Sequence, residues 1–143
     1  PIDEHNIYAQ CDALPAQYQP ACVREHVFLV RLSMLERDTD KTSQYCKYFS
    51  HWDIQVQCFG ALGGALYQDD PSTPDRIVSE CNRLDSQFVG MCIGVAARHY
   101  GFSRQPDTGK YLCSALPPEM KSHCQNGVDH AFGSLYTIQT YTE

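Results

Sequence analysis

Eight cysteines in four evenly spaced pairs are the strongest constraint on how this chain of 143 residues can fold. Zinc ligands come as C-x2-C or C-x4-C pairs, and redox-active thiols come as C-x-x-C. Neither spacing occurs here, because three of the pairs have the form C-x10-C and one has the form C-x11-C. The pattern therefore predicts a disulfide framework and an oxidising compartment. The cysteines are Cys11, Cys22, Cys46, Cys58, Cys81, Cys92, Cys113 and Cys124.

The cysteine pairs define an internal repeat. Their first members stand at positions 11, 46, 81 and 113, so successive repeats begin at nearly equal steps along the chain. The third residue after each first cysteine is apolar, and so is the seventh, counted with a one-residue insertion in the second repeat. These positions are Leu14, Phe49, Leu84 and Leu116, then Tyr18, Ile54, Phe88 and Met120. A period of this length is typical of helix–turn–helix units in stacked repeat proteins.

Turn and capping residues inside each cysteine pair predict that every repeat is a helical hairpin. Serine and aspartate cap helices, and proline favours the first helical turn. The residues that mark the bends are Pro15, Ser50, Asp85, Ser86, Pro117 and Pro118. We expect helices over 3–13 and 16–36, 41–49 and 51–67, 74–84 and 86–100, and 107–116 and 118–136.

In such a hairpin the two cysteines face each other across the bend. We therefore predict the sequential bonds Cys11–Cys22, Cys46–Cys58, Cys81–Cys92 and Cys113–Cys124. The expected fold is all-α, an α-solenoid-like stack of four stapled hairpins in a single domain over 1–143. The repeats cover about 3–36, 41–67, 74–100 and 107–136, and a short C-terminal tail follows. The alternating segment 132–143 is expected to be extended, or frayed.

Small residues recur at helical spacing in the second helix of three repeats. They are Gly60, Ala61, Gly64 and Ala65, then Gly90, Gly94 and Ala97, and finally Gly127 and Ala131. Glycine destabilises a helix by about 1 kcal/mol, so its recurrence indicates that something lies close to these positions. Close helix packing is the first interpretation, and a groove that admits a ligand is the second.

The stapled hairpin is similar to the twin C-x9-C hairpins of mitochondrial intermembrane-space proteins. Those hairpins carry two bonds each, whereas this chain has one bond per hairpin at a longer spacing. The resemblance is to a structural device and not to a family. It implies the mitochondrial intermembrane space as an alternative to a secreted or periplasmic location.

Charge and hydropathy exclude several classes of protein. Seventeen acidic residues against eleven basic ones give a net charge of −6, and the basic residues form no cluster. Nucleic acid and anionic membranes are therefore not expected as partners. The apolar stretch 58–68 is too short to span a bilayer. The chain begins at Pro1 without a methionine. This start is expected if a leader peptide has been removed or if the chain is an expressed fragment.

Histidines are the main candidates for chemistry. Glu119 and His123 lie four residues apart and share a helix face, so they form a candidate metal-binding pair. His130 lies two turns further along, too far to complete the same site by itself. His26 and His99 are expected to pack in the core or at its rim.

The other known site motifs are either incomplete in this sequence or absent from it. The segment 38–49 begins like a calcium loop but has Ser43 where glycine is required and Phe49 where glutamate is required. Its aspartates are expected to cap the helix that follows. Motifs of hydrolases, phosphate loops and haem attachment do not occur.

These observations favour a protein that is not an enzyme and that needs no cofactor. We expect a secreted or periplasmic protein-interaction or structural module, for instance a subunit of a larger extracellular assembly or filament, with a protein partner or self-assembly. The alternative is a small-ligand or metal-binding protein that uses His99, His123 and His130.

Overall fold

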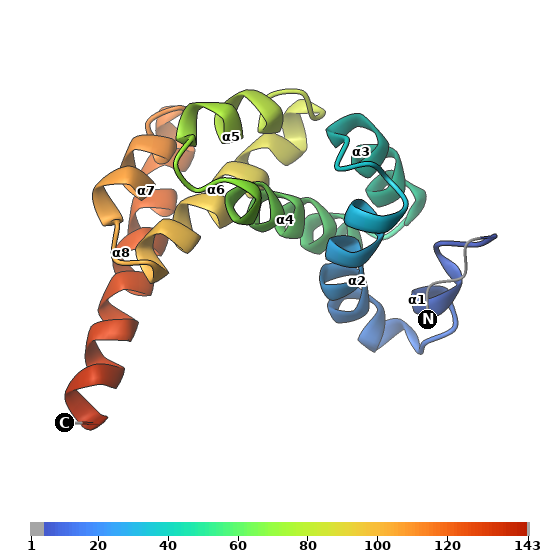
Figure 1. Cartoon of the computed structure of the whole chain (residues 1–143), viewed down its shortest axis with the longest axis horizontal. Coiled ribbons are helices and arrows are strands. Elements are labelled where there is room, and N and C mark those ends of the chain that lie inside the picture. The colour runs from blue at the N-terminus through green and yellow to red at the C-terminus, as the bar shows by residue number, and fades with distance from the viewer. Residues whose placement is uncertain (1–4, 143) are drawn as a thin grey trace. The chain divides into compact units, whose positions relative to one another are not determined.

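The computed structural model describes residues 5–142, with side chains described as far as Gly133 (Figure 1). This described part of the chain contains helices and no strand. The helices are α1 (Ala9–Asp12), the 3-10 helix η1 (Ala16–Tyr18), α2 (Gln19–Ser33), α3 (Thr39–Tyr48), α4 (Trp52–Asp69), α5 (Pro74–Cys81), α6 (Ser86–Phe102), α7 (Pro106–Cys113) and α8 (Pro118–Thr142).

All four predicted disulfides are present, each within one helical hairpin. The bonded cysteines have Cα–Cα distances of 5.5–5.7 Å, inside the range that a disulfide requires. Every cysteine is bonded. The prediction of four stapled hairpins is therefore confirmed.

The chain divides into two compact units, residues 1–62 and residues 63–143, and the boundary falls inside α4. We call these the N-terminal unit and the C-terminal unit and describe each by itself. The prediction of one domain over the four repeats stays a prediction.

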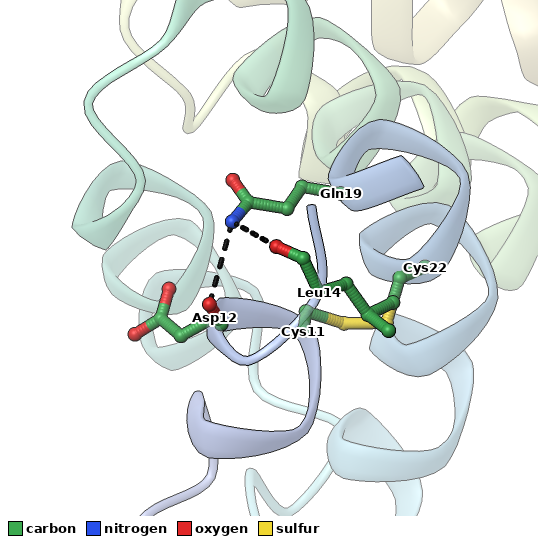
Figure 2. The surroundings of a disulfide bond; sticks show 5 residues. All are labelled: Cys11, Asp12, Leu14, Gln19 and Cys22. Carbon is green, nitrogen blue, oxygen red and sulfur yellow. Dashed lines mark hydrogen bonds between the residues drawn. A yellow bond between two sulfur atoms is a disulfide. The ribbon is translucent and has the colours of Figure 1, made fainter. Parts of the chain in front are cut away.

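The first arm of the first hairpin, in the N-terminal unit, contains little regular helix. Residues 3 and 4 of the predicted helix 3–13 lie outside the described residues, and within 5–13 the helix is reduced to the four residues of α1. The chain then turns through Pro15 into η1 before α2 begins. Figure 2 shows how the turn is closed. The Gln19 side-chain amide donates to the Leu14 carbonyl oxygen at 3.0 Å, and the Cys11–Cys22 bond lies beside this contact.

The second hairpin of the N-terminal unit follows a sharp reversal. The helix α2 ends at Ser33 and not at residue 36, because Glu36 and Arg37 adopt left-handed conformations with φ of 55° and 56°. Asp38 then caps α3, as expected, by accepting a hydrogen bond from the Lys41 backbone N–H at 2.8 Å. Tyr48 of α3 donates to the Asp12 carboxylate at 2.8 Å, which ties α3 to the end of α1.

The two hairpins of the C-terminal unit are close copies. Both α5 and α7 begin with Pro-Asp, contain eight residues and end at a cysteine. In both turns the leucine three residues later donates its backbone N–H to the carbonyl oxygen of that cysteine, at 3.1 Å for Leu84 and 3.0 Å for Leu116. Both leucines are buried.

Helix backbones approach closely at three glycines of this unit, Gly63, Gly101 and Gly109. A Cβ added at Gly63 of α4 would collide with the carbonyl oxygen of Cys92 in α6. A Cβ at Gly101 of α6 would lie 2.6 Å from the carbonyl oxygen of Val128 in α8. A Cβ at Gly109 of α7 would lie 2.7 Å from the carbonyl oxygen of Ala97 in α6. Glycine is required at all three positions, because a Cβ closer than van der Waals contact would push the helix backbones apart. None of these three glycines is among the small residues named from the sequence. Of those residues, Ala131 packs at the second contact, with its Cβ 3.1 Å from the Cβ position of Gly101.

Two predictions about helix ends are wrong. The helix predicted over 86–100 continues as α6 to Phe102, and Gly101 within it lies against Val128. Residues 132–142 are not extended, since α8 continues to Thr142, and residue 143 of the predicted tail lies outside the described residues. The segment has no proline, and a helix that is already nucleated propagates easily through such residues.

Candidate functional site

A groove of about 650 Å³ lies between α6 and α8, in the C-terminal unit. From α6 it is lined by Gly90, Met91, Gly94, Val95 and Arg98. From α8 and the turn before it, the lining residues are Leu116, Glu119, Met120, His123, Cys124, Asn126, Gly127 and His130. The spacing of both sets corresponds to one face of a helix.

The groove exists because long side chains meet glycines across it. The Met120 side chain of α8 lies directly over Gly90 of α6. The aliphatic part of Arg98 of α6 lies over Gly127 of α8, with Cγ and Cδ both 3.3 Å from the place that a Cβ would occupy. Between these two contacts, no described atom outside the adjoining residues and backbone of α6 lies within 4 Å of the place where Gly94 would carry a Cβ. The floor of the groove at Gly94 is therefore open.

The apolar part of the groove is formed by flexible side chains. Met91 is 37% exposed and Met120 is 40% exposed. Methionine has three rotatable bonds and a polarisable sulfur, so it adapts to differently shaped apolar partners. This end of the groove can accept an apolar group without a rigid match of shape.

Charged groups lie at separate ends of the groove. Arg98 of α6 lies opposite Gly127 of α8. On α8, His123 is one turn before Gly127 and His130 is about one turn after it. Glu119 lies next to Met120, about 12 Å along the helix from Gly127 at 1.5 Å per residue. The groove is therefore acidic near Met120 and basic near Arg98.

Arg98 is a basic group at this site that has no counter-ion among the described residues. Its guanidinium has no hydrogen bond or ion pair with any residue that the structure describes. The neighbouring acid Asp129 is already engaged, since its carboxylate lies 3.0 Å from the Lys110 ammonium. An exposed guanidinium in this position can bind an external anion.

The predicted metal pair, Glu119 and His123, lies within this groove. No three His, Cys, Asp or Glu side chains in the described residues come together as metal ligands. Zinc sites normally have three or four protein ligands, so the pair does not by itself form such a site. Metal binding at Glu119 and His123 stays a prediction.

The other histidines named from the sequence lie elsewhere. His26 is buried in α2, which confirms its expected place in the core. The His99 ring stacks on the Tyr67 ring, with 5.2 Å between ring centroids, and His99 does not line the groove. Burial and, to a smaller extent, the charge of Arg98 lower the pKa of His99 below its ordinary value of 6.5.

Sequence reasoning missed Arg98, Met91 and Met120 as parts of one site. Met120 occupies the seventh, apolar position of the repeat, but Tyr18 and Met120 are exposed there whereas Ile54 and Phe88 are buried. The glycine pattern of α6 and α8 was the available signal. That Met120 lies opposite Gly90 and Arg98 opposite Gly127 depends on the register between the two helices, which the repeat step does not give.

Comparison with protein-family models, with curated proteins and with solved structures returns no match. Function must therefore be inferred from the geometry of the chain. No helix within the described residues has the length and apolar character needed to cross a membrane. The four disulfides are consistent with an oxidising compartment.

Proposed function

We propose that this protein is a non-enzymatic binding module of an oxidising compartment and that the groove between α6 and α8 is its recognition surface. The observation that supports this proposal is the open floor at Gly94, flanked by the exposed Met91 and Met120. Both walls are stapled, by Cys81–Cys92 on α6 and by Cys113–Cys124 on α8. A groove with rigid walls and adaptable side chains loses little conformational entropy when a partner binds.

The first candidate partner is another protein that inserts apolar side chains into the groove. Helical grooves with exposed methionines bind varied apolar segments because the methionines can repack. Such a role fits the expected interaction module, secreted or periplasmic, and requires no catalytic group.

The experiment uses the three methionines of the chain as reporters. A peptide library displayed on phage is selected on the native protein, and selected peptides are titrated into protein labelled with ¹³C at the methionine methyl groups. We expect the Met91 and Met120 signals to shift, while Met34, in the N-terminal unit, does not.

Two glycine variants make the experiment specific to the groove. Gly94→Leu places a side chain into the open floor, and Gly133→Leu adds the same side chain on α8 outside the groove. Apart from the neighbouring residues and backbone of the same helix, no atom of the described side chains or backbone lies within 4 Å of the added Cβ at either position, so both variants should fold. Loss of binding in Gly94→Leu alone is the expected result. Equal binding by both variants would show that the groove is not the recognition surface.

A small-ligand-binding protein is the second candidate function, favoured by the size of the groove. Small-molecule sites in proteins commonly have volumes of roughly 300–1,000 Å³. The groove, at about 650 Å³, lies within that range.

Self-assembly is the third candidate function, and the observation that favours it lies in the N-terminal unit. Leu29 and Leu32 of α2 are 57% and 52% exposed, although Val27 and Val30 beside them are fully buried. If this surface joins copies of the chain, Leu29→Glu with Leu32→Glu should shift the mass measured by light scattering to that of a monomer. A wild-type protein that is monomeric at high concentration would contradict self-assembly.

A further inference from the structure

We infer that the groove between α6 and α8 binds a small amphipathic anion, an aliphatic carboxylate whose head group pairs with Arg98 and whose chain lies over Gly94 toward Met120. This inference rests on the proposed function in one respect only, the assignment of the groove as the binding surface.

The head-group position follows from Arg98. Gly127 leaves room for the aliphatic part of the Arg98 side chain to lie across α8. Arg98 is exposed and lines the groove. No described residue supplies it with a carboxylate or a carbonyl oxygen. A guanidinium binds a carboxylate through two parallel hydrogen bonds, a geometry that an ammonium group does not offer.

The position of the chain follows from the apolar lining. From Arg98 back to Gly90 is eight residues of α6, or about 12 Å at 1.5 Å per residue. Over this distance the groove presents Gly94, Val95, Met91 and Met120. The open floor at Gly94 gives the alkyl chain contact with the α6 backbone, which a larger residue would prevent.

The charge distribution fixes the direction in which the ligand lies. Glu119, the acid of the lining, is beside Met120, so an anionic head group at that end would be repelled. At the other end, His123 and His130 of α8 lie on either side of the position opposite Arg98, and neither adds negative charge. The carboxylate therefore lies at Arg98 and the end of the chain near Met120.

The test compares octanoate with octanol, which share an alkyl chain and differ in the head group. Each is titrated into protein labelled at the methionine methyl groups, and affinity is taken from the Met91 and Met120 shifts. Replacing Arg98 by glutamine should reduce the ratio of octanoate affinity to octanol affinity about fivefold, since an exposed ion pair contributes modestly. Lys121→Gln removes the same charge from α8 outside the groove lining and should leave the ratio unchanged.

Each outcome decides a separate point. If the ratio is the same in wild type and Arg98→Gln, the inference about the head group is overturned, while binding in the groove stands. If Gly94→Leu binds both ligands as the wild type does, the groove is not the binding site of octanoate and the inference is overturned, whereas the proposed function is decided by peptide binding to the same variant. A ratio that changes in Arg98→Gln, with both ligands lost in Gly94→Leu, is the result that we expect.

Discussion

The helix α6 makes two different kinds of contact with its neighbours, and glycines take part in both. At the closed contacts, Gly63 of α4 meets the backbone of α6 at Cys92, and Gly101 of α6 meets the backbone of α8 at Val128. At the groove, Gly90 and Gly127 instead meet the long side chains of Met120 and Arg98 across the same pair of helices, α6 and α8. Glycine spacing alone therefore does not distinguish packing from a binding groove. The residue that lies opposite each glycine decides between them.

The difference has a simple physical cause. When a carbonyl oxygen faces the glycine, nothing separates the two backbones, and the helices approach closely. When a methionine or an arginine lies over the glycine, the side chain occupies the contact and leaves the next position unfilled. At Gly94 that unfilled position is the floor of the groove.

Removing a disulfide should have the largest effect on stability. Cys81–Cys92 and Cys113–Cys124 have the same sequence separation, so replacing either pair by alanines should lower the free energy of unfolding by about 3 kcal/mol in the loop-entropy account. Urea denaturation measures both losses. Removal of the second pair should weaken octanoate binding more than removal of the first, because Cys124 lines the groove and Cys92 does not.

The Cys81/Cys92 variant could instead lose octanoate binding as fully as the Cys113/Cys124 variant. In that case, loosening the closed contact also disrupts the groove. The distinction between the two kinds of contact would then fail. Binding should be measured without urea, at a temperature at which circular dichroism shows both variants to be folded.

Gly63→Ala should have the next largest effect. The added Cβ would collide with the Cys92 carbonyl oxygen, and overpacking of this kind costs about 1–3 kcal/mol. The loss should outweigh the gain of about 1 kcal/mol that alanine brings to a helix interior. Thermal unfolding should therefore show a lower Tm than that of the wild type. An unchanged or higher Tm would mean that α4 and α6 can separate at no cost.

Gly94→Ala should act in the opposite direction. Its Cβ enters open space, so the variant should gain up to about 1 kcal/mol from helix propensity. A single methyl group is too small to fill the groove, and octanoate should still bind. A destabilised Gly94→Ala variant would indicate that the groove closes in solution.

The smallest effect should come from His99, which is adjacent to Arg98 but stacks on Tyr67 at the closed side of α6. Its pKa in the folded protein is lowered from 6.5, mainly by burial. Below about pH 6.5 the unfolded chain therefore binds more protons than the folded chain, and the free energy of unfolding falls as the solution is acidified.

His99→Phe keeps a ring against Tyr67 and removes this titration. The free energy of unfolding of the wild type minus that of the variant should therefore fall as the pH is lowered from 7.5 to 5.5, as measured by urea denaturation. A difference that is constant over this interval would show that His99 titrates alike in both states.

The hairpins and their disulfides could be predicted from the sequence because both depend on local spacing. A cysteine pair with C-x10-C or C-x11-C spacing around a bend has few other possible geometries. The end of α2 could not be predicted, because Glu36 and Arg37 take left-handed conformations that non-glycine residues rarely adopt and that no local signal marks. The helix predicted to end at residue 100 continues through Gly101, whose contact with Val128 belongs to tertiary packing and not to its own chain segment.

The candidate site could be predicted only in part. Glu119 and His123 were found because they are four residues apart on one helix. Arg98 comes from another helix, and its place opposite Gly127 depends on the register between α6 and α8. Such a register is a property of tertiary packing, so no motif within one segment reports it.

The matching starts of α5 and α7 suggest a use in protein design. Residues 74–105 run from one Pro-Asp start to the residue before the next, and they include a complete stapled hairpin. A second copy of this segment, inserted before Pro106, would meet the same junction chemistry at both of its ends. The C-terminal unit is thus divided at positions where its length can be changed in whole hairpins, as in an engineered repeat array.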